Sequence, residues 1–418
     1  MDPNSRPQCG DCCTYSLYEM AAPGSSRLLS IPAEIREQIY SLILHPDASR
    51  QYHENEYTSY DYRPALVIFR INRLIYVESR KVFRELNIFV NIETPWPEAR
   101  HHVAREGHVP MIAAGEKAAK YEGHYLSVTI DAPEVPPDES KKQAFLVLLS
   151  DLDKFTTMWY YSNLSHPGLN AQLRLALKLH DPYTPDYEEK RIPKSLQRKL
   201  ILPFGVLRNL RSQTLTGDPK PYPSIETELK ELQAKTDVSP EHCLREATRL
   251  KNEGNAELKV ENFHAALKLY DQAFTAIHIV NKGRIRHIHA DRFFARELRE
   301  PPYTEKNGES ERLILRVQLV ANTCQAYNKL KDYDNSSFWG LRTITTVRES
   351  MGMDANMDIP PEEEAIRGFP ATSEFVSLLG DLYAITYADS DCLGWARYTF
   401  ARRWRSKRSE TRTRRESC

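Results

Sequence analysis

The side chains best suited to bind a metal ion lie near the N-terminus, where Cys9, Cys12 and Cys13 form a C-x-x-C-C cluster. Thiolates at this spacing bind soft metal ions, but a closed zinc site needs four ligands. The nearest histidine, His45, follows a stretch that looks flexible. We therefore expect residues 1–26 to form a disordered tail that carries reactive thiols and holds no metal.

Motifs typical of catalysis are absent from the sequence. It contains no Gly-rich phosphate loop, no G-x-S-x-G elbow and no H-E-x-x-H zinc helix among its 16 glycines and 13 histidines. We expect a protein that is not an enzyme and uses no cofactor, with an enzyme or enzyme accessory that has an unrecognised site as the alternative. Six histidines are expected on the surface or in loops without a metal: His101, His102, His108, His278, His287 and His289.

Residues 247–279 have the pattern of one helix-turn-helix unit. Small side chains at Gly254 and Ala266 let two antiparallel helices approach closely, while Phe263 and Tyr270 fill the space around that contact. This pattern resembles a tetratricopeptide repeat (TPR), and the resemblance implies a protein-binding surface. The residues in repeat register are Gly254, Phe263, Ala266, Tyr270 and Ala273.

One such hairpin cannot bury its own apolar face, so further units should follow it. Two later regions fit the repeat register, starting near residues 317 and 377, and their spacing is wider than the standard unit. We expect the intervening residues 282–311 and 349–372 to form surface loops or extra helical turns. The matching residues are Asn322, Cys324, Tyr327, Leu330, Tyr333, Ser336 and Thr343 in the second unit, and Ala384, Tyr387, Leu393, Ala396 and Phe400 in the third.

A candidate peptide site lies within the first two repeats. Lys251 and Asn255 are four residues apart and share a helix face, and Asn322 would face them from the neighbouring helix. A terminal carboxylate needs converging donors of this kind. The three residues are similar to three of the five clamp residues with which some cytosolic co-chaperones hold the C-terminal carboxylate of a heat-shock chaperone. That resemblance implies peptide binding by Lys251, Asn255 and Asn322.

The rest of such a clamp departs from the pattern. Leu378 and Leu382 occupy the positions where the third repeat should supply basic residues, and Arg316 or Arg367 would have to substitute for them. The alternative is structural: the two asparagines form hydrogen bonds between helices, and Lys251 is a solvated surface charge.

The folded region begins with an amphipathic helix. Pro32 opens it, Glu34 lies in its first turn, and apolar residues recur at helical spacing from Ile35 to Ile43. A polar loop is expected over residues 45–63, followed by a second helix over residues 65–83 and a buried strand within residues 86–92.

Residues 27–92 resemble the F-box-like domains common in filamentous fungi, on the evidence of the first helix and of residues 71–90. An F-box is a small helical module that docks on the Skp-type adaptor of a cullin-RING (SCF) ubiquitin ligase, so the resemblance implies a substrate receptor. The alternative is that the apolar stripe packs against the core of its own domain. The adaptor-docking residues implied by the resemblance are Leu29, Ile31, Pro32, Ile35 and Ile39.

The remainder of the chain gives weaker signals. Residues 93–235 alternate strand-like and helix-like apolar runs, which favours an α/β region with a strand over residues 173–179 and a charged helix or linker over residues 225–235. The C-terminal residues 406–418 are expected to form a basic disordered tail, with a nuclear-import signal as the alternative.

Whole-chain composition is ordinary for globular proteins. The 418 residues carry 57 basic and 57 acidic side chains, so nucleic acid is not an expected partner. No apolar run approaches the roughly 20 residues of a membrane helix. The seven cysteines suit free thiols in a reducing compartment, so we expect the cytoplasm or nucleus and no membrane.

Together these features predict a mixed fold: an F-box-like helical N-terminal module with an α/β middle region, followed by an all-α TPR-like helical repeat array over residues 241–405. The expected function is a protein-interaction adaptor. Its expected partners are a Skp-type adaptor and cullin, with heat-shock chaperones as the alternative.

Overall fold

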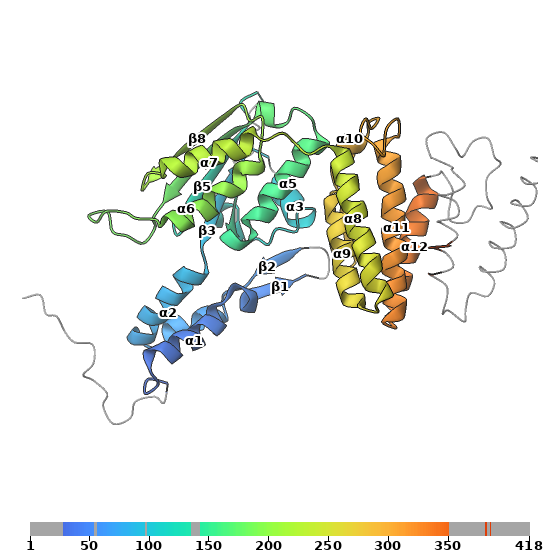
Figure 1. The fold of residues 1–418 in the computed structure, drawn as a ribbon. Coiled ribbons are helices and arrows are strands. Elements are labelled where there is room, and N and C mark those ends of the chain that lie inside the picture. The colour runs from blue at the N-terminus through green and yellow to red at the C-terminus, as the bar shows by residue number, and fades with distance from the viewer. Residues whose placement is uncertain are drawn as a thin grey trace, which may run out of the picture. The chain divides into compact units, whose positions relative to one another are not determined.

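The structure is a computed structural model that describes residues 28–53, 57–96, 98–134 and 143–350, with Asp381, Leu382 and Ile385. The described chain is a mixed α/β protein that divides into two compact units (Figure 1). The first unit comprises residues 28–51 and 60–88, and the second comprises the other described residues. The predicted N-terminal tail with its cysteine cluster, most of the third repeat and the basic C-terminal tail lie outside the described residues.

The first unit is built on helices α1 (Ala33–Leu44) and α2 (Arg73–Leu86), which pack against each other. Two short 3-10 helices, η1 (Pro46–Ser49) and η2 (Ala65–Arg70), lie between them in the chain. The side chains of the shared core are Tyr40, Leu44, Ala65, Ile68, Ile75 and Val82.

The helix predicted over residues 65–83 is interrupted, so that prediction is wrong in part. Asn72 has an extended backbone (φ −161°, ψ 173°), and its side-chain oxygen accepts a hydrogen bond from the backbone N–H of Ile75. An extended residue with this side-chain bond is a helix N-cap. The chain therefore ends η2 and starts α2 as a separate helix.

The polar loop predicted over residues 45–63 contains more regular structure than expected. After η1, strands β1 (Arg50–Tyr52) and β2 (Thr58–Tyr60) form a two-stranded sheet. Tyrosines at the ends of both strands favour extended backbone. The loop was predicted from its polar residues, so this preference was not considered.

Buried Asn87 joins the C-terminal ends of α1 and α2. Its side-chain NH₂ donates to the carbonyls of Leu44 and Phe83, at 3.1 and 3.0 Å, and its oxygen accepts from the hydroxyl of Tyr62 at 2.6 Å. A buried amide is tolerated when its donors and acceptor are paired. One side chain thus satisfies a terminal carbonyl of each helix.

A six-stranded mixed sheet forms the first part of the second unit, with strand order β4-β6-β3-β5-β7-β8. The pairs β3–β5 and β7–β8 are parallel, and the other neighbours are antiparallel. The strand predicted over residues 173–179 is confirmed as β7, whose leucines are buried at alternate positions. The strands are β3 (Phe89–Thr94), β4 (Ala113–Ala114), β5 (Leu126–Asp131), β6 (Gln143–Leu148), β7 (Arg174–His180) and β8 (Ser212–Asp218).

Several helices lie between the strands of this sheet in the chain, and one follows its last strand. The charged segment predicted near residues 225–235 is a helix, α7, that buries Ile225 and Leu229. Helices α5, α6 and α7 pack together through η5 (Figure 1). The helices are α3 (Ala99–Arg105), α4 (Glu116–Ala119), η3 (Leu149–Asp151), α5 (Leu152–Ser165), η4 (Asn170–Gln172), α6 (Lys194–Ile201), η5 (Leu202–Val206) and α7 (Pro223–Ala234).

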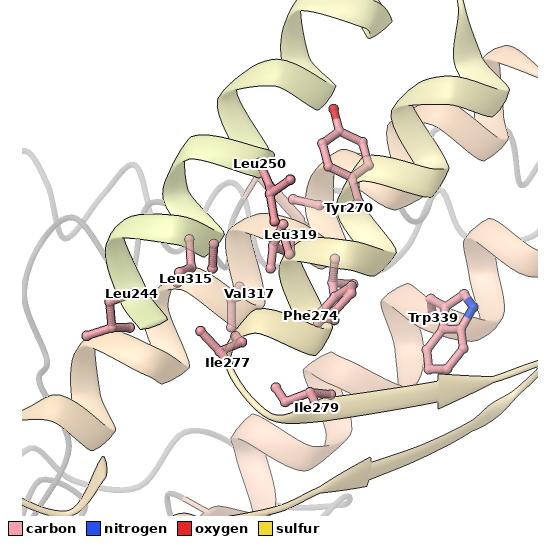
Figure 2. Packing of buried hydrophobic residues seen from close by; sticks show 14 of the residues in the cluster. Leu244, Leu250, Tyr270, Phe274, Ile277, Ile279, Leu315, Val317, Leu319 and Trp339 are labelled. Atoms are coloured by element: carbon pink, nitrogen blue, oxygen red, sulfur yellow. The ribbon is translucent and has the colours of Figure 1, made fainter. Parts of the chain in front are cut away.

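The second part of this unit is helical and contains two antiparallel hairpins side by side (Figure 1). Helices α8 (Pro240–Lys259) and α9 (Phe263–Ala276) form the first hairpin, and α11 (Gly308–Lys329) and α12 (Tyr333–Ser350) form the second. Figure 2 shows how Tyr270 and Phe274 of α9 lie among leucines of α8 and α11. This apolar cluster is continuous across both hairpins.

The segment between the hairpins was expected to form surface loops or helical turns, and this prediction is wrong in part. It contains a β-hairpin, β9 (Ile279–Lys282) with β10 (Ile285–Ile288), and a short helix, α10 (Asp291–Phe294). Phe294 and Leu298 are buried in the same apolar cluster as the hairpins. None of the helices in the described part of the chain is long and apolar enough to span a membrane.

Candidate functional site

The first helical hairpin packs through the small residues that the sequence singled out. A Cβ atom added at Gly254 would lie 2.5 Å from Cε1 of Tyr270, which is shorter than the contacts that real Cβ atoms make. Ala266 and Ala273 are fully buried. Because Gly254 has no side chain, the ring of Tyr270 fits directly against α8.

The second hairpin has a similar close contact made by polar side chains. The thiol of Cys324 donates to the carbonyl of Ser336 at 3.3 Å, and the Ser336 hydroxyl donates to the carbonyl of Cys324 at 3.2 Å. Ser336 and Thr343 are almost completely buried. Burial raises the pKa of Cys324 to about 12, so this thiol stays protonated and structural.

Only a fragment of the predicted third repeat lies among the described residues. Leu382 is fully buried in the apolar cluster, and the carbonyl of Ile385 accepts a hydrogen bond from Asn328 of α11. The remaining residues assigned to this repeat, and Leu378, lie outside the described part of the chain. The buried Leu382 supplies no charge at the position where a clamp would need a basic residue.

The three predicted peptide-binding residues lie together between α8 and α11. The ammonium of Lys251 donates to the side-chain oxygen of Gln318 at 2.6 Å. The side-chain oxygen of Asn255 accepts bonds from the Asn322 amide at 2.7 Å and from the Tyr270 hydroxyl at 2.9 Å. The asparagines therefore form a hydrogen bond between helices, as the structural alternative predicted. Gln318 also belongs to this set, and it was not predicted from the sequence.

Lys251 is half-buried, so the expectation of a solvated surface charge is wrong. Burial lowers the pKa of its ammonium. Its hydrogen-bond partner among the described residues is the neutral Gln318. A desolvated ammonium without a described carboxylate partner attracts an anion.

Arg316 does not extend this set. Burial first, and then the charges of Arg312 and Arg342, lower its pKa to about 10, which places Arg316 among other arginines. The other candidate for a missing basic residue, Arg367, lies outside the described residues.

In the first unit, the apolar stripe of α1 faces solvent. Ile35 is 43% exposed and Leu42 is 76% exposed, and Ile43 is exposed as well. The buried face of α1 instead carries Arg36, Tyr40 and Leu44, spaced four residues apart. The alternative in which this stripe packs in its own core is therefore wrong for Ile35 and Ile43. Of the predicted docking residues, Pro32 and Ile35 are exposed, whereas Leu29, Ile31 and Ile39 are partly buried.

A polar network holds α1 in this orientation. The guanidinium of Arg36 donates to both carboxylate oxygens of Glu78 on α2, at 2.9 and 2.5 Å, and the Tyr40 hydroxyl donates to Glu78 at 2.9 Å. The bonds from Arg36 lower the pKa of Glu78, and burial followed by the Glu78 contact raises the pKa of Tyr40 to about 12. The four-residue spacing of Arg36, Tyr40 and Leu44 is the sequence feature from which the buried face of α1 could have been predicted.

Further large apolar side chains of the first unit are exposed. They come from η2, from the residues that follow it and from α2. Isolated exposed apolar residues are common, whereas a group of them on a small module marks an interaction surface. These residues are Val67, Ile71, Leu74, Tyr76 and Val77.

Three of the histidines expected on the surface or in loops do lie outside helices and strands, but they are buried. His108, His278 and His289 are only 5–6% exposed, and the ring of Tyr161 contacts the rings of His278 and His289. Burial lowers their pKa values to about 4, 3 and 4 respectively. Within the described residues, no group of three or more side chains is arranged to hold a metal ion.

Comparison with protein-family models, with curated proteins and with solved structures gives no match for this chain. Two surfaces of the described residues are the candidates for function: the apolar stripe of α1 and the polar set around Lys251.

Proposed function

We propose that this protein is a non-enzymatic adaptor that docks a Skp-type adaptor of a cullin-RING ubiquitin ligase through an F-box-like module and binds a second protein with TPR-like helices. The single observation that carries the proposal is the apolar stripe of α1, which stays in solvent because the Arg36–Glu78–Tyr40 network occupies the opposite face. An exposed stripe on a firmly held helix fits a partner that supplies an apolar groove. The docking residues would be Leu29, Ile31, Pro32, Ile35 and Ile39.

A binding assay with a purified Skp-type adaptor tests this. Ile35→Asp alone, and together with Ile39→Asp, should weaken binding by about tenfold or more, because a carboxylate would be desolvated in the apolar contact. Gln38→Asp is the matched control, since Gln38 is an exposed polar residue of the same helix. Circular dichroism and thermal melting must show that each variant folds. Equal binding by the Ile35→Asp and Gln38→Asp variants would reject docking through α1.

A second candidate function is a co-chaperone-like adaptor that binds the acidic C-terminal peptide of a heat-shock chaperone. The observation that favours it is the half-buried Lys251 with its neutral partner beside Asn255 and Asn322. A carboxylate would neutralise this charge and accept further bonds from it.

This candidate predicts a specific dependence on the terminal carboxylate. An acidic C-terminal peptide should bind the wild type, and either amidation of the peptide or Lys251→Gln should reduce the affinity about tenfold or more. Lys259→Gln, an exposed change near the end of the same helix, is the control. Equal affinity for the free-acid and amidated peptides would rule out a carboxylate clamp at this site.

A further inference from the structure

Two arginines lie near Trp339 in the helical part of the second unit, and the charge of a third acts on one of them. The guanidinium carbon of Arg286, on β10, lies 4.3 Å from the ring centroid of Trp339 and 4.8 Å from that of Phe274. The guanidinium carbon of Arg342, on α12, lies 5.8 Å from the same Trp339 ring. Arg316, on α11, belongs to the group because its charge and that of Arg342 both act on Arg286. The three arginines form what we call the arginine cluster.

Two members of this cluster have buried donors that no described residue pairs with. Arg286 is 9% exposed; its Nε donates to the side-chain oxygen of Asn281 at 3.0 Å, while its buried Nη1 has no hydrogen-bond partner among the described residues. In the same described part of the chain, the buried Nε of Arg316 also has no partner. Buried donors on charged groups are strongly unfavourable when unpaired, and native structures rarely leave them so.

Arg312, one helical turn before Arg316, shows what a purely structural arginine looks like here. Its Nε donates to the carbonyl of Ile277, Nη2 donates to the carbonyl of His289, and Nη1 pairs with the carboxylate of Asp291 at 2.8 Å. Every nitrogen of this guanidinium is used. The described residues give Arg286 and Arg316 no comparable set, although Arg286 is buried and Arg316 is partly buried.

Positive charge is concentrated around these donors. Burial first, and then the charges of neighbouring arginines, lower the pKa of Arg286 to about 9 and that of Arg316 to about 10. Both guanidinium groups therefore remain charged at neutral pH. The Asp291 carboxylate is used by Arg312, and the ring faces of Phe274 and Trp339 attract a cation without supplying a counter-charge.

We propose that Arg286, Arg316 and Arg342 form an oxyanion site that takes a doubly charged phosphate group. Guanidinium groups recognise phosphate oxygens through paired, parallel hydrogen bonds. A dianion balances the charge of three cations better than the single charge of one carboxylate does. The exposed Arg342 and the partly exposed Arg316 provide the accessible side of the site, and Arg286 provides its buried base. The ligand is either free phosphate or a phosphate group carried on a larger molecule. This site shares no residue with the Lys251 set.

Thermal melting of the full chain with phosphate tests the site, with ionic strength matched by chloride. At about 10 mM phosphate, the Tm of the wild type should rise by roughly 2–4 °C. Without phosphate, Arg316→Met should melt at or above the wild-type temperature, because the change keeps the volume and removes a repelling charge. With phosphate, this variant should lose most of the rise in Tm.

Arg249→Met is the matched control, since Arg249 is an exposed arginine that pairs with Glu246 and Glu253. It should keep the full response to phosphate. If Arg316→Met fails to fold, Arg342→Gln replaces it as a test at an exposed position, and it should reduce the response. The proposal is overturned if the wild type does not respond, if the cluster variant and the control respond equally, or if succinate, a dianion without a tetrahedral group, stabilises as well as phosphate.

The source of the group is tested with O-phospho-L-serine. A larger shift with O-phospho-L-serine than with inorganic phosphate supports a phosphate carried on a larger molecule. A shift with inorganic phosphate alone supports free phosphate as the ligand.

Discussion

Helices α1 and α8 present opposite chemistry to solvent. In the first unit, α1 turns Arg36 and Tyr40 inward and leaves Ile35 in water. In the second unit, α8 turns Leu250 and Gly254 inward and leaves polar residues, Lys251 and Asn255 among them, on its more accessible side. A polar network orients the first helix, whereas apolar packing orients the second. The surface left for a partner is therefore apolar in one unit and polar in the other, and each predicts a different kind of ligand.

Acid should destabilise the second unit more than the first, and this is the largest of the predicted effects. Burial, and then nearby positive charge, holds the pKa values of His108, His278 and His289 at about 4, 3 and 4, below the ordinary value of 6.5. The unfolded chain therefore binds more protons than the folded chain between these values. Stability of the second unit is complete above pH 6.5 and falls, by several kcal/mol in total, as the pH drops toward 4.

The first unit should resist acid over that range. Its Glu78 has a lowered pKa, so the stability it contributes is present above the ordinary value of 4.5 and is lost only as the pH falls through the lower folded value. Hydrogen exchange read by mass spectrometry at pH 7, 5.5 and 4.5 resolves the two units. Simultaneous loss of protection in both units would contradict the assignment of the effect to the histidines.

Truncation of the largest fully buried side chain in the helical region comes next. Tyr270→Ala removes a fully buried ring that contacts Gly254 and the hydroxyl that bonds Asn255. The free energy of unfolding of the second unit should fall by about 3–5 kcal/mol, as for other large-to-small core changes. Urea denaturation measures it, and Tyr270→Phe, which loses only the hydroxyl, should cost about 1 kcal/mol.

The contrast between the two helices shows what the sequence could predict. The α8–α9 hairpin follows from small and bulky residues at fixed spacing, because the contacts that orient these helices are close in sequence. The orientation of α1 depends on Glu78, which is 42 residues from Arg36. The break at Asn72, the β9–β10 hairpin and the burial of the histidines likewise depend on contacts that apolar periodicity does not encode. The same limit applies to the candidate sites: Lys251, Asn255 and Asn322 were predicted from their resemblance to a known clamp, whereas Gln318 and the arginine cluster were not predicted.

The buried ion pair of the first unit gives the third prediction. Glu78→Leu leaves Arg36 with an uncompensated, mostly buried charge, so the free energy of unfolding of this unit should fall by about 3 kcal/mol. Combining it with Arg36→Met should recover most of that loss, because two apolar side chains of similar size can replace a buried pair. Urea denaturation of the two single variants and the double variant gives the coupling energy. Additive losses in the double variant would show that the two side chains act independently.

The smallest effect is expected at Lys251, and its sign distinguishes a binding site from a structural contact. Burial already disfavours the charge of Lys251, and its partner Gln318 is neutral and partly accessible to water. Lys251→Met should therefore leave the second unit as stable as the wild type or more stable by up to about 1 kcal/mol, measured by urea denaturation. Lys259→Met provides the baseline for an exposed lysine of the same helix. A clear loss of stability in Lys251→Met alone would mean that the ammonium holds α8 to α11. A gain would mean that the folded protein maintains an unfavourable charge beside Asn255 and Asn322, which is the condition for a polar surface that binds an anionic partner, in contrast to the apolar surface of α1.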